Sequence, residues 1–160
     1  MLLRIAVPLL SLTVLGACDG SRNNPVSHDA SVSAVALSSA PSFVRSGALN
    51  VQKECSGYTG QAGEICTITS SNVPEIEVGS TITYASAAVG AALDTDITLD
   101  LPGPGNNRAF GHCTLSLATG IGECRLLGGT GKFQWIRATV AVSPLGWPNF
   151  AWDGTYSYGK

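Results

Sequence analysis

Charged side chains are scarce in this chain. Only 12 % of its 160 residues are Asp, Glu, Lys or Arg, and the formal net charge is −2. Proteins that bind nucleic acid carry an excess of Lys and Arg, which neutralises the phosphates. Nine basic residues against eleven acidic ones provide no such excess, so we predict no nucleic-acid partner.

The chain also lacks the common motifs of catalysis and metal binding. It has two histidines, His28 and His112, and no Gly-x-Ser-x-Gly sequence that would expose a nucleophilic serine. No two cysteines show the Cys-x-x-Cys spacing typical of zinc sites. We therefore predict neither a metal nor another cofactor, and the sequence leaves open whether the protein is an enzyme. His112 is expected to be a hydrogen-bonded residue of a strand.

The Gly-rich segment Gly128–Lys132 invites comparison with a phosphate-binding loop. Leu126 occupies the position of the first required glycine, and Phe133 stands where such loops have Ser or Thr. We therefore expect a tight corner between two strands, in which glycine adopts a positive φ.

Acidic residues gather at two places. Asp94, Asp96 and Asp100 share one face of a predicted strand. They lack the glycine and the distant glutamate of an EF-hand, so we expect a solvated face. Glu75 and Glu77 are expected to be an exposed pair. The alternative is a carboxylate in an apolar barrel mouth, where burial would raise its pKa and suit it to general acid or base catalysis.

Residues 1–17 are predicted to be a secretory signal peptide. Arg4 is followed by an apolar run, Ile5–Leu15, that is too short and too interrupted for a membrane span. Leu15–Cys18 (LGAC) resembles the cleavage site of bacterial lipoproteins, whose cysteine is acylated on its sulfur and on its new amino group. Two or more acyl chains anchor a protein stably. The alternative is ordinary cleavage, which would leave Cys18 as a free thiol.

Residues 18–47 are predicted to be a flexible tether. This segment is rich in Ser, Ala and Asn and shows no sustained apolar periodicity. With a lipid on Cys18, it implies an exported protein of the bacterial cell envelope, anchored to a lipid bilayer on the periplasmic or the surface side.

Residues 48–160 are predicted to form one all-β domain. The chain has 19 glycines and 8 prolines, and short runs with apolar and polar alternation are separated by turn residues. Short connections favour an antiparallel meander, and about eight strands suit a closed barrel. We predict a single antiparallel eight-stranded β-barrel with strands at Ala48–Cys55, Glu64–Ser70, Ser80–Ala88, Thr95–Leu101, Ala109–Leu117, Glu123–Leu127, Phe133–Ser143 and Phe150–Tyr158.

The four cysteines of this domain are spaced in pairs. Ten residues separate Cys55 from Cys66, and ten separate Cys113 from Cys124. Across a hairpin, an even number of intervening residues places two side chains opposite each other, within reach of a disulfide. An exported protein also meets an oxidising compartment. We predict the disulfides Cys55–Cys66 and Cys113–Cys124, while two other connectivities stay open.

Three segments of the C-terminal half, Gly129–Phe133 (GTGKF), Ile136–Val142 (IRATVAV) and Trp152–Tyr156 (WDGTY), resemble the barrel shared by plant allene oxide cyclases and dirigent proteins. Gly111–Thr114 (GHCT) and Cys66–Asn72 (CTITSSN) look like a secreted bacterial branch with this barrel, whose members are mostly uncharacterised. The resemblance extends roughly from residue 51 to residue 158.

The resemblance implies a cofactor-free barrel that confines one reactive conformer of an apolar molecule. It also raises a trimer as a possible assembly, since the plant proteins are usually trimers. The predicted function is a cell-envelope lipoprotein whose barrel binds a small apolar or aromatic molecule or serves a structural role. The alternative is a cofactor-independent isomerase or cyclase of the allene oxide cyclase type.

Mass spectrometry of the mature protein checks the anchor and the bridges together. We expect a chain that begins at Cys18 and carries acyl groups on its sulfur and amino group, because a lipoprotein signal peptidase cleaves before the cysteine. The four other cysteines should resist alkylation until they are reduced. An unmodified Cys18, or free thiols in the barrel domain, would contradict these predictions.

Overall fold

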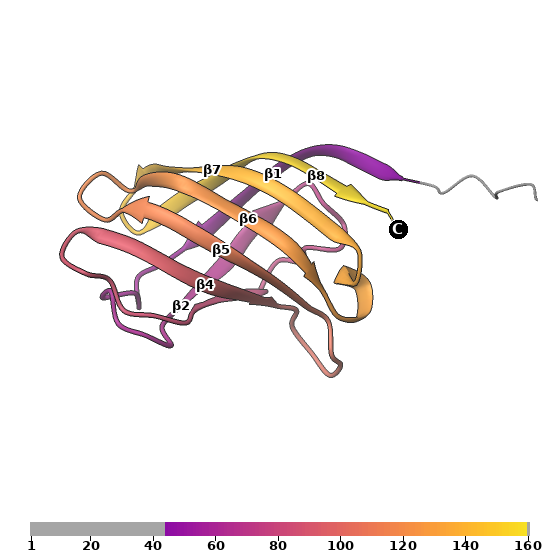
Figure 1. The fold of residues 1–160 in the computed structure, drawn as a ribbon, viewed down its shortest axis with the longest axis horizontal. Coiled ribbons are helices and arrows are strands. Elements are labelled where there is room, and N and C mark those ends of the chain that lie inside the picture. Colours follow the sequence, from indigo (N-terminus) through magenta and orange to yellow (C-terminus); the bar gives the residue numbers. More distant parts are fainter. Residues whose placement is uncertain (1–43, 160) are drawn as a thin grey trace, which may run out of the picture. The chain divides into compact units, whose positions relative to one another are not determined.

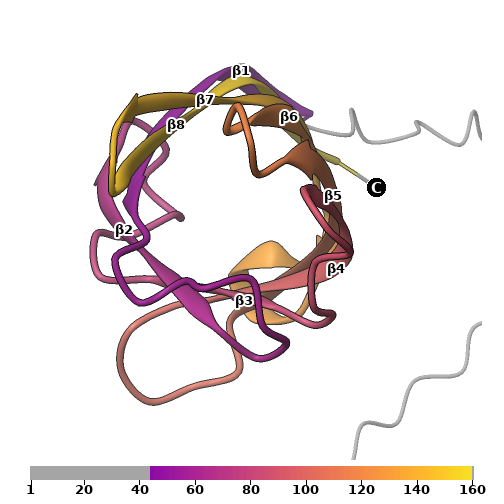
Figure 2. The ribbon, with the colours of Figure 1, turned by 90° about the vertical axis from the view of Figure 1, so that its left-hand side faces the viewer.

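The computed structural model describes residues 44–159. They form a closed barrel in which consecutive strands pair antiparallel and β8 pairs with β1 (Figures 1 and 2). The predicted all-β, eight-stranded antiparallel barrel is confirmed. Its elements are β1 (Arg45–Glu54), β2 (Ile65–Ser71), β3 (Thr81–Tyr84), β4 (Ala92–Asp100), β5 (Arg108–Ser116), β6 (Ile121–Gly129), the 3-10 turn η1 (Gly131–Phe133), β7 (Ile136–Gly146) and β8 (Asn149–Tyr158).

The predicted signal peptide, Cys18 and most of the predicted tether lie outside the described residues. β1 begins at Arg45, so the end of the segment predicted as tether, up to residue 47, belongs to the barrel. Within residues 44–159, no helix is long and apolar enough to cross a membrane.

Each strand alternates between the interior of the barrel and its outer wall. In β4, Ile97 and Leu99 are buried, whereas Asp94 and Asp96 are exposed, as the sequence predicts. The same alternation runs along β7, where the buried side chains are Ile136, Ala138, Val140 and Val142. A closed ring of strands has no free edge, so inward positions are shielded by the whole barrel.

Phe133 departs from the prediction. Phe133 is predicted to begin a strand, but β7 begins at Ile136, and Phe133 is fully buried at the end of η1. Gly131, with a φ of 55°, turns the chain, and the Phe133 N–H donates to Thr130 O at 3.0 Å. This turn directs the aromatic ring into the core because an outward position would leave it in water.

The two ends of the barrel differ. At the end that we call the base, where β1 starts and β8 ends, the connections carry side chains that close the barrel: Val73, Ile76, Leu101 and Phe133. At the other end, the mouth, the β1–β2, β3–β4, β5–β6 and β7–β8 connections meet, and Figure 2 looks onto this end. Apolar side chains therefore close the barrel at the base.

Both predicted disulfides are present and lie inside the barrel. Cys55 is bonded to Cys66, with a Cα–Cα distance of 4.4 Å, and Cys113 to Cys124, with 4.1 Å. Cys113 and Cys124 are direct partners in the β5–β6 ladder, as the spacing argument requires. All four side chains are buried. The bridges therefore link neighbouring strands and also act as core residues.

Replacing Cys113 and Cys124 with Ala is expected to lower the free energy of unfolding by about 2–3 kcal/mol, because the unfolded chain loses a short covalent loop. Urea unfolding followed by circular dichroism measures this loss. Thr114→Ala with Glu123→Ala, which changes the exposed pair next to the bridge, is the control and should cost far less. Equal stability of wild type and the Cys variant would contradict a bridge at this position.

Candidate functional site

One lysine lies inside the barrel. Lys53 is 2 % exposed and follows Leu49 and Val51 on the inward face of β1, whereas Asn50 and Gln52 point outward. Within residues 44–159 it is the one charged side chain that is buried. Lysines are almost never fully buried without a partner of opposite charge, so this position needs an explanation.

The neighbours of Lys53 are aromatic. Its Nζ donates a hydrogen bond to Tyr84 Oη at 2.6 Å and lies 4.7 Å from the centroid of the Trp152 ring and 5.3 Å from that of Tyr84. None of the salt bridges found in the described part of the chain includes Lys53. A phenol and two ring faces replace only part of the lost hydration.

Burial therefore lowers the pKa of Lys53 to about 7. The same desolvation raises the pKa of Tyr84, which keeps its proton at neutral pH. Near pH 7, a substantial fraction of the Lys53 amine is uncharged and stands beside a protonated phenol. Such a pair can accept and donate protons, as groups at functional sites often do.

A pocket opens at the mouth of the barrel, and Lys53 and Tyr84 are among the residues that line it. We call it the mouth pocket; its volume is about 380 Å³. The Cys55–Cys66 bridge forms part of its wall, and Cys66 Sγ lies 3.7 Å from Tyr84 Oη. The other large lining side chains are mostly apolar and include Tyr58, Leu93, Leu115, Trp147 and Phe150. This combination of an apolar wall and a few polar groups is typical of small-molecule sites.

Two further polar atoms near this pair have no hydrogen-bond partner in the described protein. Tyr58 Oη is buried, and the Tyr58 ring packs against Tyr84 with 4.9 Å between centroids. Trp152 Nε1 is also buried, on the ring that faces Lys53. Buried donors are normally satisfied, so the Tyr58 hydroxyl, on a side chain that lines the mouth pocket, is available to a polar group of a bound molecule.

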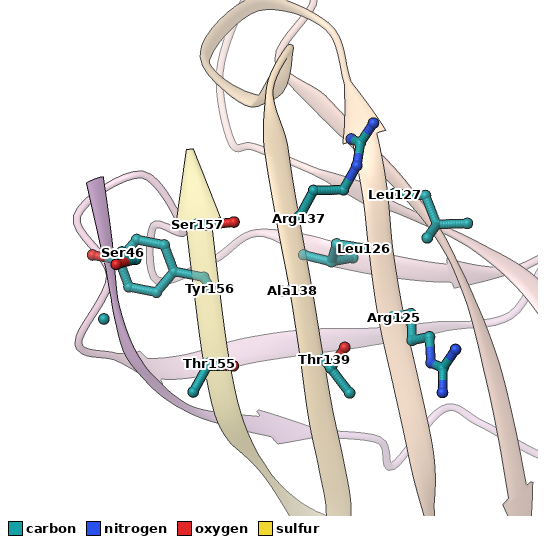
Figure 3. A pocket seen from close by; sticks show the side chains of 11 residues that line it. Ser46, Arg125, Leu126, Leu127, Arg137, Ala138, Thr139, Thr155, Tyr156 and Ser157 are labelled. Carbon is teal, nitrogen blue, oxygen red and sulfur yellow. The ribbon is translucent and has the colours of Figure 1, made fainter. Parts of the chain in front are cut away.

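A second hollow, the outer groove, crosses β6, β7, β8 and β1 on the outer wall and has a volume of about 510 Å³ (Figure 3). Figure 3 shows Arg125 and Arg137 on neighbouring strands of this groove. Arg125 Nε donates to Glu123 at 2.6 Å, and Arg137 Nη1 donates to the carbonyl of Ile136 at 2.9 Å. The groove is open to solvent, which screens its charges, so it is the weaker candidate.

His112 lies on the outer wall of the barrel, on the face of β5 opposite to that of the buried Cys113. Its Nε2 is 2.6 Å from Asp94 Oδ1, and its Nδ1 is 2.9 Å from Asp96 Oδ1. The hydrogen bond to Asp96, and then that to Asp94, raises the pKa of His112. Asp100 pairs instead with Arg108 at 2.9 Å. The acidic face and His112 are thus a solvent-exposed ion-pair cluster, as the sequence analysis expects for a wall residue.

The other residues considered in the sequence analysis lie near the base. Glu75 forms a salt bridge with Arg45, which lowers the pKa of Glu75, and Glu77 lies 2.8 Å from Lys132. Both carboxylates therefore lie at the base and not in the mouth, so the alternative of a carboxylate in the barrel mouth is wrong. Gly128–Lys132 forms the expected corner, where Gly128 and Gly131 have positive φ.

Sequence reasoning missed Lys53. The signal was present, because Lys53 stands in the same alternation as Leu49 and Val51, with Cys55 next in line. A lysine at an inward position of a barrel strand is a polar residue placed in the core. The sequence alone shows that Lys53 faces inward, but not its partners: Tyr84 lies two strands away on β3, and Trp152 is on β8, which pairs with β1 only in the closed ring.

Comparison of the chain with models of protein families, with curated proteins and with solved structures found no match. The resemblance to allene oxide cyclases and dirigent proteins therefore stays a prediction, and the site has to be interpreted from its own chemistry.

Replacing Lys53 with Met is expected to stabilise the protein, and more at low pH than at high pH. The unfolded lysine has a pKa near 10.5 and the folded one about 7, so between these values the unfolded chain binds a proton that the folded chain lacks. The free energy of unfolding of the wild type should therefore rise from pH 7 towards pH 10.5. Below pH 7 the amine is protonated in both states, and the whole cost of burying the charged group applies. We expect the stabilisation by Lys53→Met to be larger at pH 6 than at pH 9 by about 2–3 kcal/mol.

Urea unfolding of both proteins at the two pH values, with disulfides intact, measures this difference. Lys132→Met is the matched control, because Lys132 is half exposed and lies beside Glu77 on the surface. A stabilisation by Lys53→Met that does not change with pH would show that the buried amine has an ordinary pKa.

Proposed function

We propose that the barrel binds a small, mainly apolar or aromatic molecule in the mouth pocket, with one hydrogen-bond acceptor of that molecule facing Lys53. The observation that carries this proposal is the position of the Lys53 amine, buried among aromatic rings at the wall of a pocket. No carboxylate of the described chain pairs with this amine, and an acceptor group of the ligand would take that place.

A purely structural barrel gives no reason for this lysine. Leu49 and Val51 fill the same face of β1 with apolar side chains, and a methionine at position 53 would avoid the desolvation of an amine. Destabilising groups beside a pocket are typical of binding and catalytic sites, because function there requires residues that a more stable version of the same fold would not have.

The proposal places the barrel in the cell envelope, exported through the signal peptide and anchored through a lipid on Cys18. Two disulfides fit an oxidising compartment, because thiols stay reduced in the cytosol of most bacteria. The anchor itself is supported by the sequence Leu15–Cys18 and by the four paired cysteines, which leave Cys18 as the unpaired one.

A second candidate function is a cofactor-independent isomerase or cyclase. The specific observation in its favour is the Lys53–Tyr84 hydrogen bond, since an uncharged amine and a protonated phenol can serve as base and acid in one apolar site. It ranks second because a reaction needs a second polar group that holds the substrate. In the described pocket that role falls to Tyr58, which also suits simple binding.

Binding is tested with 1-anilinonaphthalene-8-sulfonate, which has an aromatic body, one anionic acceptor group and a fluorescence that rises in apolar surroundings. Leu115→Trp should fill the mouth pocket and weaken binding of the dye at least about tenfold, measured by fluorescence titration. Leu127→Trp makes the same change in the outer groove, where Leu127 is 57 % exposed, and should leave the affinity unchanged.

The two variants separate the two hollows of the molecule. Loss of binding in Leu127→Trp alone would move the site to the outer groove and overturn the proposal. Tight binding that neither variant affects would show that the dye does not report on the mouth pocket, and it would count against the proposed function as well. Cooperative urea unfolding of each variant confirms that the barrel is intact.

A further inference from the structure

We propose that Lys53 captures small apolar aldehydes covalently, by forming a reversible imine inside the mouth pocket. This inference rests on the proposed function, because it uses the same pocket and assigns a chemical class to its ligand. It depends on three features of the part of the chain that the structure describes: an amine at the wall of an apolar pocket, a phenol in contact with that amine, and the lack of a carboxylate beside it.

The amine is placed to act as a nucleophile. An ammonium group has no lone pair, and a salt bridge would hold lysine in that form. Among residues 44–159 Lys53 has no such partner, and the titratable side chains around it are Tyr84 from β3 and Tyr58 from the β1–β2 connection. Both are uncharged phenols at neutral pH, and burial raises the pKa of each. The surroundings therefore favour the free amine near pH 7.

The phenol of Tyr84 stands where the proton transfers occur. Lys53 Nζ attacks the carbonyl carbon, the C–N bond forms as the C=O π bond breaks, and one N–H proton passes to the oxygen, giving a carbinolamine. Loss of the hydroxyl group with a second proton releases water as the C=N bond forms. Tyr84 Oη, at 2.6 Å from Nζ, can take a proton from the nitrogen and give one to the leaving hydroxyl. No oxidant or reductant is needed.

The shape and polarity of the pocket select the aldehyde. Its volume of about 380 Å³ and its lining of Leu93, Leu115 and Phe150 suit a ring system or a short aliphatic chain. An apolar lining also favours the condensed product, because each imine formed releases a water molecule from a poorly hydrated site. Sugars and other polar aldehydes would lose hydration there and are excluded.

The chain supplies its own comparison. It has three lysines, Lys53, Lys132 and Lys160, and Lys160 lies outside the described residues. Lys132 is 51 % exposed and its Nζ is 2.8 Å from Glu77, which is the ordinary situation of a surface lysine. An amine held in an ion pair with a carboxylate does not offer a free lone pair to an aldehyde, so Lys132 is the internal reference for slow labelling.

The experiment treats the full mature protein with 2-naphthaldehyde and sodium cyanoborohydride, which reduces an imine to a stable amine. Peptide mapping by mass spectrometry then finds each modified lysine by a mass gain equal to the aldehyde minus one oxygen atom. We expect Lys53 to be labelled at least about tenfold faster than Lys132 at pH 7.5. The rate at Lys53 should rise from pH 6 to pH 8 and then level off.

Two variants and one competitor complete the design. Lys53→Arg should abolish labelling in the pocket and leave labelling of Lys132 unchanged, while Lys132→Met should leave labelling of Lys53 unchanged. 1-Anilinonaphthalene-8-sulfonate should slow the labelling of Lys53, because both probes occupy the mouth pocket. Lys53→Arg is checked by circular dichroism, and the comparison of Lys53 with Lys132 in the wild-type protein holds even if this variant does not fold.

The possible failures are distinguishable. If Lys53 is labelled no faster than Lys132 while the dye still binds in the mouth pocket, covalent capture is wrong and the proposed binding function survives. If neither the dye nor the aldehyde reaches the pocket, both proposals fail. Labelling of Lys53 that the dye does not slow would place the reaction outside the binding site and overturn the inference.

Discussion

Closure of the sheet into a ring is the constraint on which this structure depends. Once β8 pairs with β1, every second residue of each strand is committed to the interior. A long side chain on an open sheet can bend around an edge to reach water, but a closed barrel has no edge. Lys53 follows two aliphatic residues on the inward face of β1, and it therefore enters the core with them.

The barrel tolerates this lysine because other interactions compensate for it. A folded pKa about 3.5 below the unfolded value corresponds to a cost of about 5 kcal/mol at low pH. Each short-loop disulfide contributes about 2–3 kcal/mol in the opposite direction. The two effects are similar in size, so the covalent bridges and the buried amine have to be considered together in any account of stability.

Much of the fold can be predicted from the sequence, because the information is local. Alternation in Asp94–Asp100, glycine at the turns and the even spacing of the cysteines each follow from strand geometry, and all three appear in the structure. Phe133 could not be placed, since a single 3-10 turn reverses its direction. The site could not be predicted either. It joins Lys53 of β1 to Tyr84, two strands away on β3, and to Trp152 of β8, which lies beside β1 only because the ring closes.

The bridge between Cys55 and Cys66 has a consequence for the rigidity of the mouth pocket. It forms part of the pocket wall, and Cys66 lies against the tyrosine that contacts Lys53. A chain whose thiols are still reduced has not yet fixed this wall. Reduction of this bridge would therefore loosen the wall next to the tyrosine that holds Lys53, and the geometry around the amine would become sensitive to the redox state of a bond that it does not touch.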